Sequence, residues 1–138
     1  HLVERTYLDT DGNKQTKQGI TFSPFLKTKL VGVLGSSFIK QPADQCRYRQ
    51  IYDDYKHRLE HHAVYGIAND EVRKAQIKKE KKINYKPKLH RHNMAVRYMV
   101  KMFLLDLWTA WRELEGLPVT PSYHEAKLGH QHRELCHV

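Results

Sequence analysis

The sequence is poor in the features that small secreted proteins and membrane proteins depend on. Its only two cysteines, Cys46 and Cys136, lie far apart and outside any CxxC spacing, which argues against a disulfide framework. The most apolar stretch, residues 94–111, contains two basic side chains and one acidic side chain, so crossing a bilayer would bury charge. No apolar leader segment is visible. We therefore expect no membrane partner and a cytoplasmic, nucleoid-associated location.

Acidic residues are also few beside the basic ones. The 24 Lys and Arg exceed the 15 Asp and Glu by nine, with ten His still uncounted. Such a surface attracts polyanions and gains affinity by releasing their counterions, whereas an anionic membrane would also require an anchor. DNA is the expected partner, and RNA is a second candidate. A length of 138 residues suits one hydrophobic core, so we expect residues 1–138 to be a single nucleic-acid-binding domain and a fragment of a longer protein.

Helical periodicity predicts an all-α domain of several helices. Residues 1–22 contain a turn-forming cluster and predict a loop or a short hairpin, with no convincing strand pair. Ser23 followed by Pro24 predicts a helix start, and Gly35 predicts an end or a kink. An apolar stripe that begins at Tyr48 predicts an amphipathic helix ending at Gly66.

Two further helices follow in the sequence. Asn69 is suited to capping a helix with acidic residues in its first turn and Lys78–Lys82 at its end, although few apolar residues line that helix. Residues 90–115 carry two adjacent apolar rows and predict a long, central core helix that packs against residues 48–65. The tail 119–138 is polar and His-rich, with a turn or two around 123–128.

The basic residues gather in four regions of the chain, which favours a binding surface over scattered solvated charges. Tyrosines interleave with them and are suited to stacking on bases, although Tyr48, Tyr52 and Tyr55 lie on a core stripe. The candidate nucleic-acid-binding residues are Lys14, Lys17, Lys27, Lys29, Arg47, Arg49, Lys56, Arg58, Lys81, Lys82, Lys86, His90, Arg91, Arg97 and Lys101.

Arg97 and Lys101 form the most specific pair among these candidates. They lie four residues apart on the one polar seam of an otherwise apolar helix, so they project together. We expect this seam to contact nucleic acid. The alternative is that the two cations pair with Asp53, Asp54 or Glu60 on the neighbouring helix.

Histidine-rich stretches raise the alternative of a metal site. An HxH pair on a helix directs its two rings about 200° apart, and no CxxC accompanies an HxxxH, so we expect no metal. Asp53 and Asp54 are adjacent and cannot share one helix face, so they do not form the carboxylate pair of a two-metal nuclease site. Asp54 suits Arg58 as an ion-pair partner on the same helix. The candidates for a His-based metal site are His90, His92, His130, His132, Cys136 and His137.

Three stretches of the chain form a series that resembles a known family. They are SPFLKTKLVGVLGSSFI from Ser23, YRQIYDDYKHRLEHH from Tyr48, and HRHNMAVRYMVKMFLLDLWTAWRELEGLPV from His90, the last followed by YHEAKLGH. Over about residues 17–130 this series resembles the C-terminal transposase domain of the DEDD insertion-sequence transposases, whose recombination is guided by a bridge RNA.

The resemblance implies a DNA-binding domain that takes part in transposition, with guide RNA as a second candidate ligand. In that family an N-terminal resolvase-like domain supplies four carboxylates for a divalent metal, so this chain would hold no cofactor itself, and we expect the full-length protein to be a homo-oligomer. The family's nucleophile is a serine before a glycine in the basic loop. Here Thr10 and Asp11 precede Gly12 instead, which leaves open whether the chain is an enzyme. The hydroxyl candidates are Ser23, Ser36, Ser37 and Thr10.

Two other function classes stay open at this point. One is a non-catalytic nucleic-acid-binding or assembly module, and the other is a His-rich metal-binding protein. Stoichiometric zinc in the purified chain would favour the second class over the others.

Salt dependence tests the charge argument directly. If about six phosphates are neutralised, affinity for DNA or RNA should fall by roughly three orders of magnitude between 50 and 200 mM salt. Fluorescence anisotropy titrations at several salt concentrations measure this slope. A flat salt dependence would contradict a role for the net charge.

Overall fold

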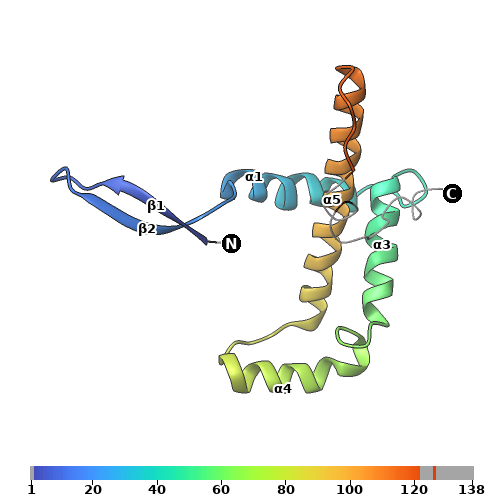
Figure 1. Cartoon of the computed structure of the whole chain (residues 1–138). Coiled ribbons are helices and arrows are strands. Elements are labelled where there is room, and N and C mark those ends of the chain that lie inside the picture. The colour runs from blue at the N-terminus through green and yellow to red at the C-terminus, as the bar shows by residue number, and fades with distance from the viewer. Residues whose placement is uncertain (1, 122–125, 127–138) are drawn as a thin grey trace.

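The computed structural model describes residues 2–121 and residue 126 and is mostly helical, with one two-stranded sheet (Figure 1). The strands β1 (Leu2–Leu8) and β2 (Lys14–Ile20) pair antiparallel, with Leu2 opposite Ile20 and Leu8 opposite Lys14. The loop 9–13 closes the hairpin, and Gly12 adopts a positive φ of 78°. The prediction of a mainly helical fold is therefore confirmed, and the prediction that the fold is all-α is wrong.

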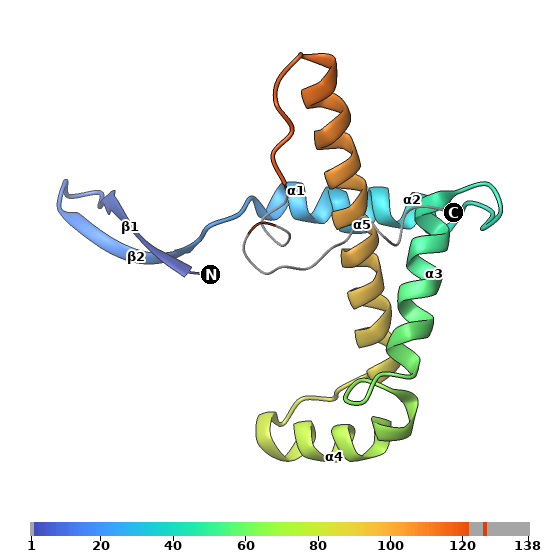
Figure 2. The same ribbon diagram turned by 45° about the vertical axis from the view of Figure 1, so that its right-hand side comes forward.

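A short hairpin was one of the two alternatives predicted for residues 1–22, but the strand pair itself was not expected, because it buries almost nothing. Every residue of β1 is exposed, and only the last two residues of β2 are half-buried. A strand pair with solvent on both faces has no apolar face to produce an alternating pattern. Hydrogen bonds between the main chains of Asp9, Gly12 and Asn13 fix the turn instead. The hairpin consequently projects away from the helices (Figure 2).

The first helical segment is continuous through three short parts. These are α1 (Pro24–Thr28), the π-helical η1 (Lys29–Leu34) and α2 (Gly35–Ile39). The predicted start is confirmed, because the Ser23 hydroxyl accepts a hydrogen bond from the Leu26 amide at 3.3 Å. Gly35 does not end the helix. It is buried, and a Cβ at this position would lie 2.9 Å from Cγ1 of Val96, so glycine permits close packing on the last helix.

The helix α3 (Arg47–Glu60) directs its predicted apolar stripe toward the core, with Tyr52 and Leu59 buried. It ends six residues before the predicted Gly66. The ring Nδ1 of His62 accepts hydrogen bonds from the amides of Val64 and Tyr65, and this local bonding competes with helical bonding.

Next come η2 (Ile67–Asn69) and the helix α4 (Asp70–Lys81). The side chain of Asn69 does not cap α4 but donates to the carbonyl of Ala63. Acidic residues in the first turn and lysines in the last turn match the predicted order and suit the helix dipole. Because no residue of α4 is buried, its position depends on contacts at its first turn.

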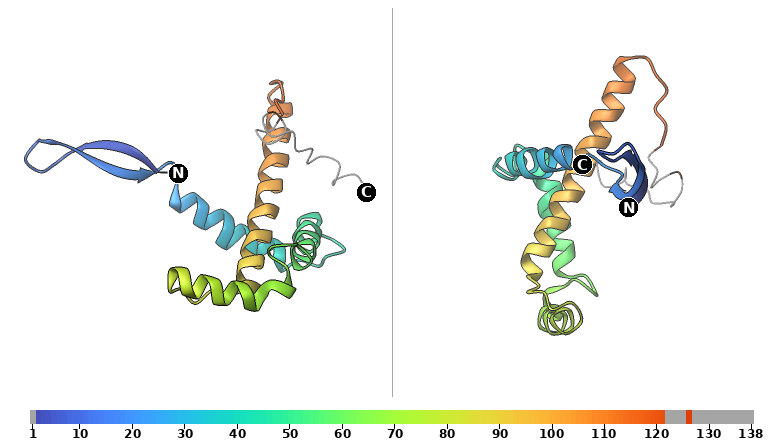
Figure 3. Two further views of the ribbon diagram at one scale, coloured as in Figure 1. Left: turned by 60° about the horizontal axis from the view of Figure 1, so that its bottom comes forward. Right: turned by 90° about the vertical axis from the view of Figure 1, so that its left-hand side faces the viewer.

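The helix α5 (Pro87–Leu114) is the spine of the molecule, as expected, and α3 lies along its first half (Figures 1 and 3). It starts three residues earlier than predicted, because proline at a first helical position sacrifices no needed donor. The predicted packing of α3 on α5 is confirmed. The buried core residues are Tyr52, Ala95, Val96, Met99 and Val100, and Leu30, Val31, Phe38, Ile39, Tyr48, Ile51 and Tyr55 pack against them.

The last third of α5 is not a core helix. Leu107, Trp108, Trp111 and Leu114 are all exposed, and this part of the helix extends beyond α1 and α3 (Figure 2). The apolar rows were predicted to be buried along their full length, and that prediction is wrong for this third. Gly116, with a φ of 64°, follows the helix. The predicted turns around 123–128 and the His-rich tail lie outside the described residues.

Gly35 provides a test of the packing between the first helical segment and α5. Replacing Gly35 by Leu should lower the free energy of unfolding by about 1–3 kcal/mol, because the new side chain collides with Val96. Gly32→Leu is the matched control, since nothing lies within 4 Å of a Cβ there, and helix propensity favours the change. Urea unfolding followed by circular dichroism measures both. Equal stability of the two variants would contradict the close packing.

Candidate nucleic-acid interface

Most described arginines contact carboxylates, carbonyls or aromatic rings of the same chain, whereas most described lysines face solvent. Three of the ion pairs formed by described residues involve an arginine. A guanidinium suits this role because its planar donors match a carboxylate or stack on an aromatic ring. The pairs are Arg47–Asp106, Arg49–Asp53, Lys74–Glu71 and Arg91–Asp70.

Arg91, a predicted nucleic-acid contact, is instead an internal residue. Its side chain is 4% exposed, and its two terminal nitrogens lie 2.6 and 2.9 Å from the carboxylate oxygens of Asp70. It also donates to the carbonyl of Tyr65 at 2.9 Å. Removing a buried cation from such a pair would leave an uncompensated charge, so Arg91 cannot reach a phosphate without breaking this part of the fold.

Arg47, Arg49 and Arg58 also contact groups of the same chain, although Arg47 and Arg58 remain exposed. Arg47 lies 3.1 Å from Asp106 on α5, and Arg49 bonds Asp53 at 2.7 Å and the carbonyl of Ile39. The guanidinium of Arg58 lies over the Tyr55 ring at 4.7 Å. It does not form the predicted ion pair with Asp54 in the described structure.

The tyrosines of α3 are packing residues, as their place on a core stripe suggested. The Tyr52 hydroxyl lies 2.7 Å from Nδ1 of His92, and Tyr55 stacks on Tyr98. The Tyr48 hydroxyl donates to Asp106 at 3.0 Å, and burial together with that carboxylate raises the pKa of Tyr48 to about 12. None of the three is therefore placed to stack on a base.

Six lysines surround the junction of α4 and α5, and we call this surface the lysine turn. All six are exposed, and none forms an ion pair with a described residue. The left-handed backbone of Lys82 ends α4, and Pro87 starts α5. The loop between them (Figure 1) thus carries cations on both sides. The lysine turn consists of Lys78, Lys79, Lys81, Lys82, Lys86 and Lys88.

An arginine–aromatic cluster supports the lysine turn from inside. The Arg73 guanidinium lies 4.8 Å from the ring centre of Tyr65 and 5.7 Å from that of Tyr85. His90 lies 5.4 Å from Tyr85, ring centre to ring centre. The Nε atom of Arg73 is buried and has no hydrogen-bond partner among the described residues. Sequence reasoning missed this cluster, because its members come together only in the folded chain.

His90 belongs to this cluster and is half-buried. Burial is the main cause that lowers its pKa, and the positive charges of Arg73, Arg97 and Arg91 lower it further. The lowered pKa disfavours the imidazolium form, so His90 is less suited to neutralising a phosphate than the exposed lysines beside it. Its contact with nucleic acid stays a prediction.

The other predicted lysines lie elsewhere on the molecule. Lys14 and Lys17 lie on β2, and Lys27 and Lys29 lie in the first helical segment, all four exposed. Lys56 is half-buried on α3 beside the Tyr52 ring. In Figures 1 and 3 the hairpin and α4 extend to the same side of α5 but lie at different levels along it, so the predicted residues form separate basic surfaces.

Arg97 and Lys101 are not equivalent, although sequence spacing treated them as a pair. Arg97 is exposed and makes no hydrogen bond or ion pair within the described part of the chain. Lys101 is half-buried and has an interaction partner. Of the two residues of the predicted seam, only Arg97 is exposed enough to contact nucleic acid.

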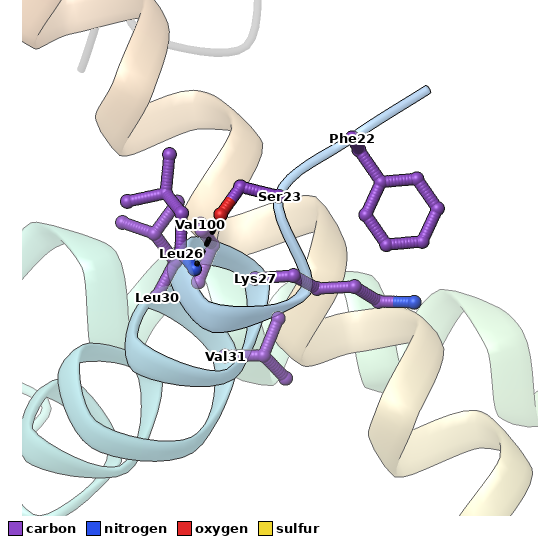
Figure 4. Close-up of a pocket in the computed structure, with 7 residues that line it drawn as sticks. All are labelled: Phe22, Ser23, Leu26, Lys27, Leu30, Val31 and Val100. Carbon is purple, nitrogen blue, oxygen red and sulfur yellow. Dashed lines mark hydrogen bonds between the residues drawn. The ribbon is translucent and has the colours of Figure 1, made fainter. Parts of the chain in front are cut away.

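The candidate nucleophiles have structural roles or lack a base. Ser23 caps α1 (Figure 4), and the hydroxyl of Ser37 donates to the carbonyl of Val33. Thr10 donates to Asp9 in the hairpin loop. Ser36 lines a pocket of about 390 Å³ beside Lys40 and His92 but has no hydrogen bond to either. Activation of a serine requires such a bond, so the geometry assigns no nucleophile.

Metal ligands do not gather in the described structure. No group of three or more His, Cys, Asp or Glu side chains is suitably placed within residues 2–121. The predicted pairs His130–His132 and Cys136–His137 lie outside the described residues. Likewise, none of the described helices combines the length and the hydropathy needed to cross a bilayer.

Comparisons with known protein families, with characterised proteins and with solved structures find no match to this chain.

The Arg91–Asp70 ion pair should stabilise the folded chain over a defined range of pH. Asp70→Asn should lower the free energy of unfolding by roughly 3–5 kcal/mol at neutral pH, because it leaves Arg91 buried and unpaired. The hydrogen bond from Arg91 lowers the pKa of Asp70 below its ordinary value near 3.8. The ion pair therefore contributes its full stabilisation of the folded state at pH values above the ordinary pKa of Asp70. This stabilisation is lost as the pH falls through the lower pKa that Asp70 has in the folded state.

Glu71→Gln is the matched control for Asp70→Asn. It removes an exposed ion pair on the same helix and should change stability by less than about 0.5 kcal/mol. Urea unfolding at several pH values measures both variants. A gap between wild type and Asp70→Asn that stays constant far below pH 4, or an equal effect of the two variants, would contradict the assignment.

Proposed function

We propose that this chain binds nucleic acid through the lysine turn, as the DNA-binding domain of an insertion-sequence transposase. The observation that carries the proposal is the density of free ammonium groups. Six exposed lysines lie between positions 78 and 88, and none of them has an ion-pair partner in the described structure. Lysines this close together repel one another unless a polyanion neutralises them.

The mode of binding follows from the residue type. A lysine contacts phosphate as a point charge, and phosphate contacts carry no direct sequence information. Tyr85 is half-buried in the same loop as Lys86, and an aromatic side chain beside lysines is suited to stacking on a base. We therefore expect salt-sensitive binding with weak sequence preference.

The three family-like stretches support DNA as the target and guide RNA as a second ligand. The proposal assigns no reaction to this chain alone. The position of the family's serine is occupied by Thr10 and Asp11, and the candidate hydroxyls Ser23, Ser36, Ser37 and Thr10 have no hydrogen bond to an activating base among the described residues. Any divalent metal for recombination would belong to a separate N-terminal domain.

The lysine turn can be tested against an equal loss of charge elsewhere. Replacing Lys78, Lys79, Lys81 and Lys82 by Gln should reduce the slope of log affinity against log salt by about three to four. The control replaces Lys14, Lys17, Lys27 and Lys29 by Gln, which removes the same charge from the hairpin and the first helical segment. It should change the slope by less.

The measurement is anisotropy of a labelled duplex and of a labelled single-stranded RNA at several salt concentrations. Circular dichroism verifies that both variants keep their helices. Equal slopes for both variants would contradict the lysine turn as the principal site. An unchanged slope in both would contradict nucleic-acid binding by these lysines altogether.

A further inference from the structure

The last third of α5 carries an apolar stripe that none of the other described helices covers. Its members are spaced by three, four and three residues, which is the a/d spacing of a helix that pairs with another helix. Trp108 lies beside them, 37% exposed. Exposed fractions of this size on one helix face are unusual for a surface that remains in water. The stripe consists of Leu104, Leu107, Trp111 and Leu114, which are 38%, 49%, 62% and 88% exposed.

An apolar groove continues the stripe toward α1. Val100 lies one helical turn before Leu104 and lines this groove of about 290 Å³. In Figure 4, Leu26 and Leu30 approach Val100 on one side and Phe22 lies at the other end. The groove has almost no polar lining, so an apolar side chain is the occupant that it suits.

The two ends of this surface carry opposite charges. Glu113 and Glu115 are exposed at the tip of α5, and Glu115 accepts a hydrogen bond from the indole of Trp111. At the groove end, Lys27 is exposed and lies over the Phe22 ring at 4.8 Å. No described acidic residue pairs with Lys27. The acidic tip and the basic groove rim are complementary only if a second helix runs in the opposite direction.

We propose that the stripe binds the same stripe of a second copy of this chain, antiparallel and with two-fold symmetry. Leu104 of each copy then packs on Leu114 of the other, and Leu107 packs on Trp111, which is the a-to-d' layering of an antiparallel helix pair. The tip of each α5 reaches the groove of the other copy. There the acidic tip meets Lys27.

Charge and area favour this occupant and this direction. A parallel pair would place the acidic tips against each other and bring the two strongly basic bodies to the same end, whereas the antiparallel pair separates the bodies. The exposed stripe with Trp108 amounts to roughly 600 Å² per copy, and the groove brings it near the ~800 Å² per partner of a standard stable interface. The inference is independent of nucleic-acid binding.

The oligomeric state of the full chain tests the proposal. Sedimentation velocity should find a dimer at about 10–100 µM, and Leu107→Glu should raise its dissociation constant by about 30-fold or more. The matched control is Val72→Glu, an exposed apolar residue on α4, which should leave the dimer unchanged. A monomeric wild type, or a dimer equally stable in Leu107→Glu, would overturn the proposal.

Charge exchange gives a second variant that leaves the apolar stripe intact. Glu113→Lys with Glu115→Lys should weaken the dimer by about tenfold, and adding Lys27→Glu should restore it. Failure of this rescue in variants that keep their helicity would contradict contact between the tip and the groove.

Cross-linking fixes the direction. With Cys46 and Cys136 replaced by Ser, a mixture of Leu104→Cys and Leu114→Cys chains should form mixed disulfide dimers. Each variant alone should cross-link poorly. Preferential linkage of either variant to itself would indicate a parallel pair and would overturn the antiparallel arrangement.

Discussion

One turn of α5 holds the molecule together. Ala95 and Met99 are completely buried at the place where α3 packs along α5, and Val96 and Val100 on the same turn contact the first helical segment. A small residue at position 95 lets two helix backbones approach closely, and Gly35 does the same for the segment that crosses α5. Because close-packed interiors transmit any change of volume, this turn determines how α3 and the first helical segment pack on α5.

The ends of α5 have different roles because different contacts lie there. At its start, Arg91 ties α4 to α5 through Asp70, although α4 buries no residue of its own. At its end no described helix covers the apolar stripe. A single helix thereby presents a basic junction at one end and an apolar surface at the other, with the core between them.

The basic residues fall into two groups according to whether the side chain ends in a guanidinium or in an ammonium group. Most described guanidinium groups lie against carboxylates, carbonyls or aromatic rings, as for Arg91 and Arg73, while most described ammonium groups remain in water. Net charge counted from the sequence treats both groups alike. The surface charge available to a polyanion therefore comes mainly from lysine, which favours contact with phosphates over base recognition.

The sequence alone determined the helical class, the Ser23 cap, the stripe of α3 and the central place of α5, because each depends on local spacing or a local hydrogen bond. The clustered lysines near position 80 were also visible in it. The sequence did not show which basic side chains are exposed and which are paired inside the fold. Arg91 and Asp70, for example, are 21 residues apart and meet only when α4 folds onto α5. The hairpin lacked a buried face, and the last third of α5 looked like core. The spacing of apolar residues along the sequence predicts which side chains share one face of a helix. Only the tertiary structure shows whether another part of the chain covers that face.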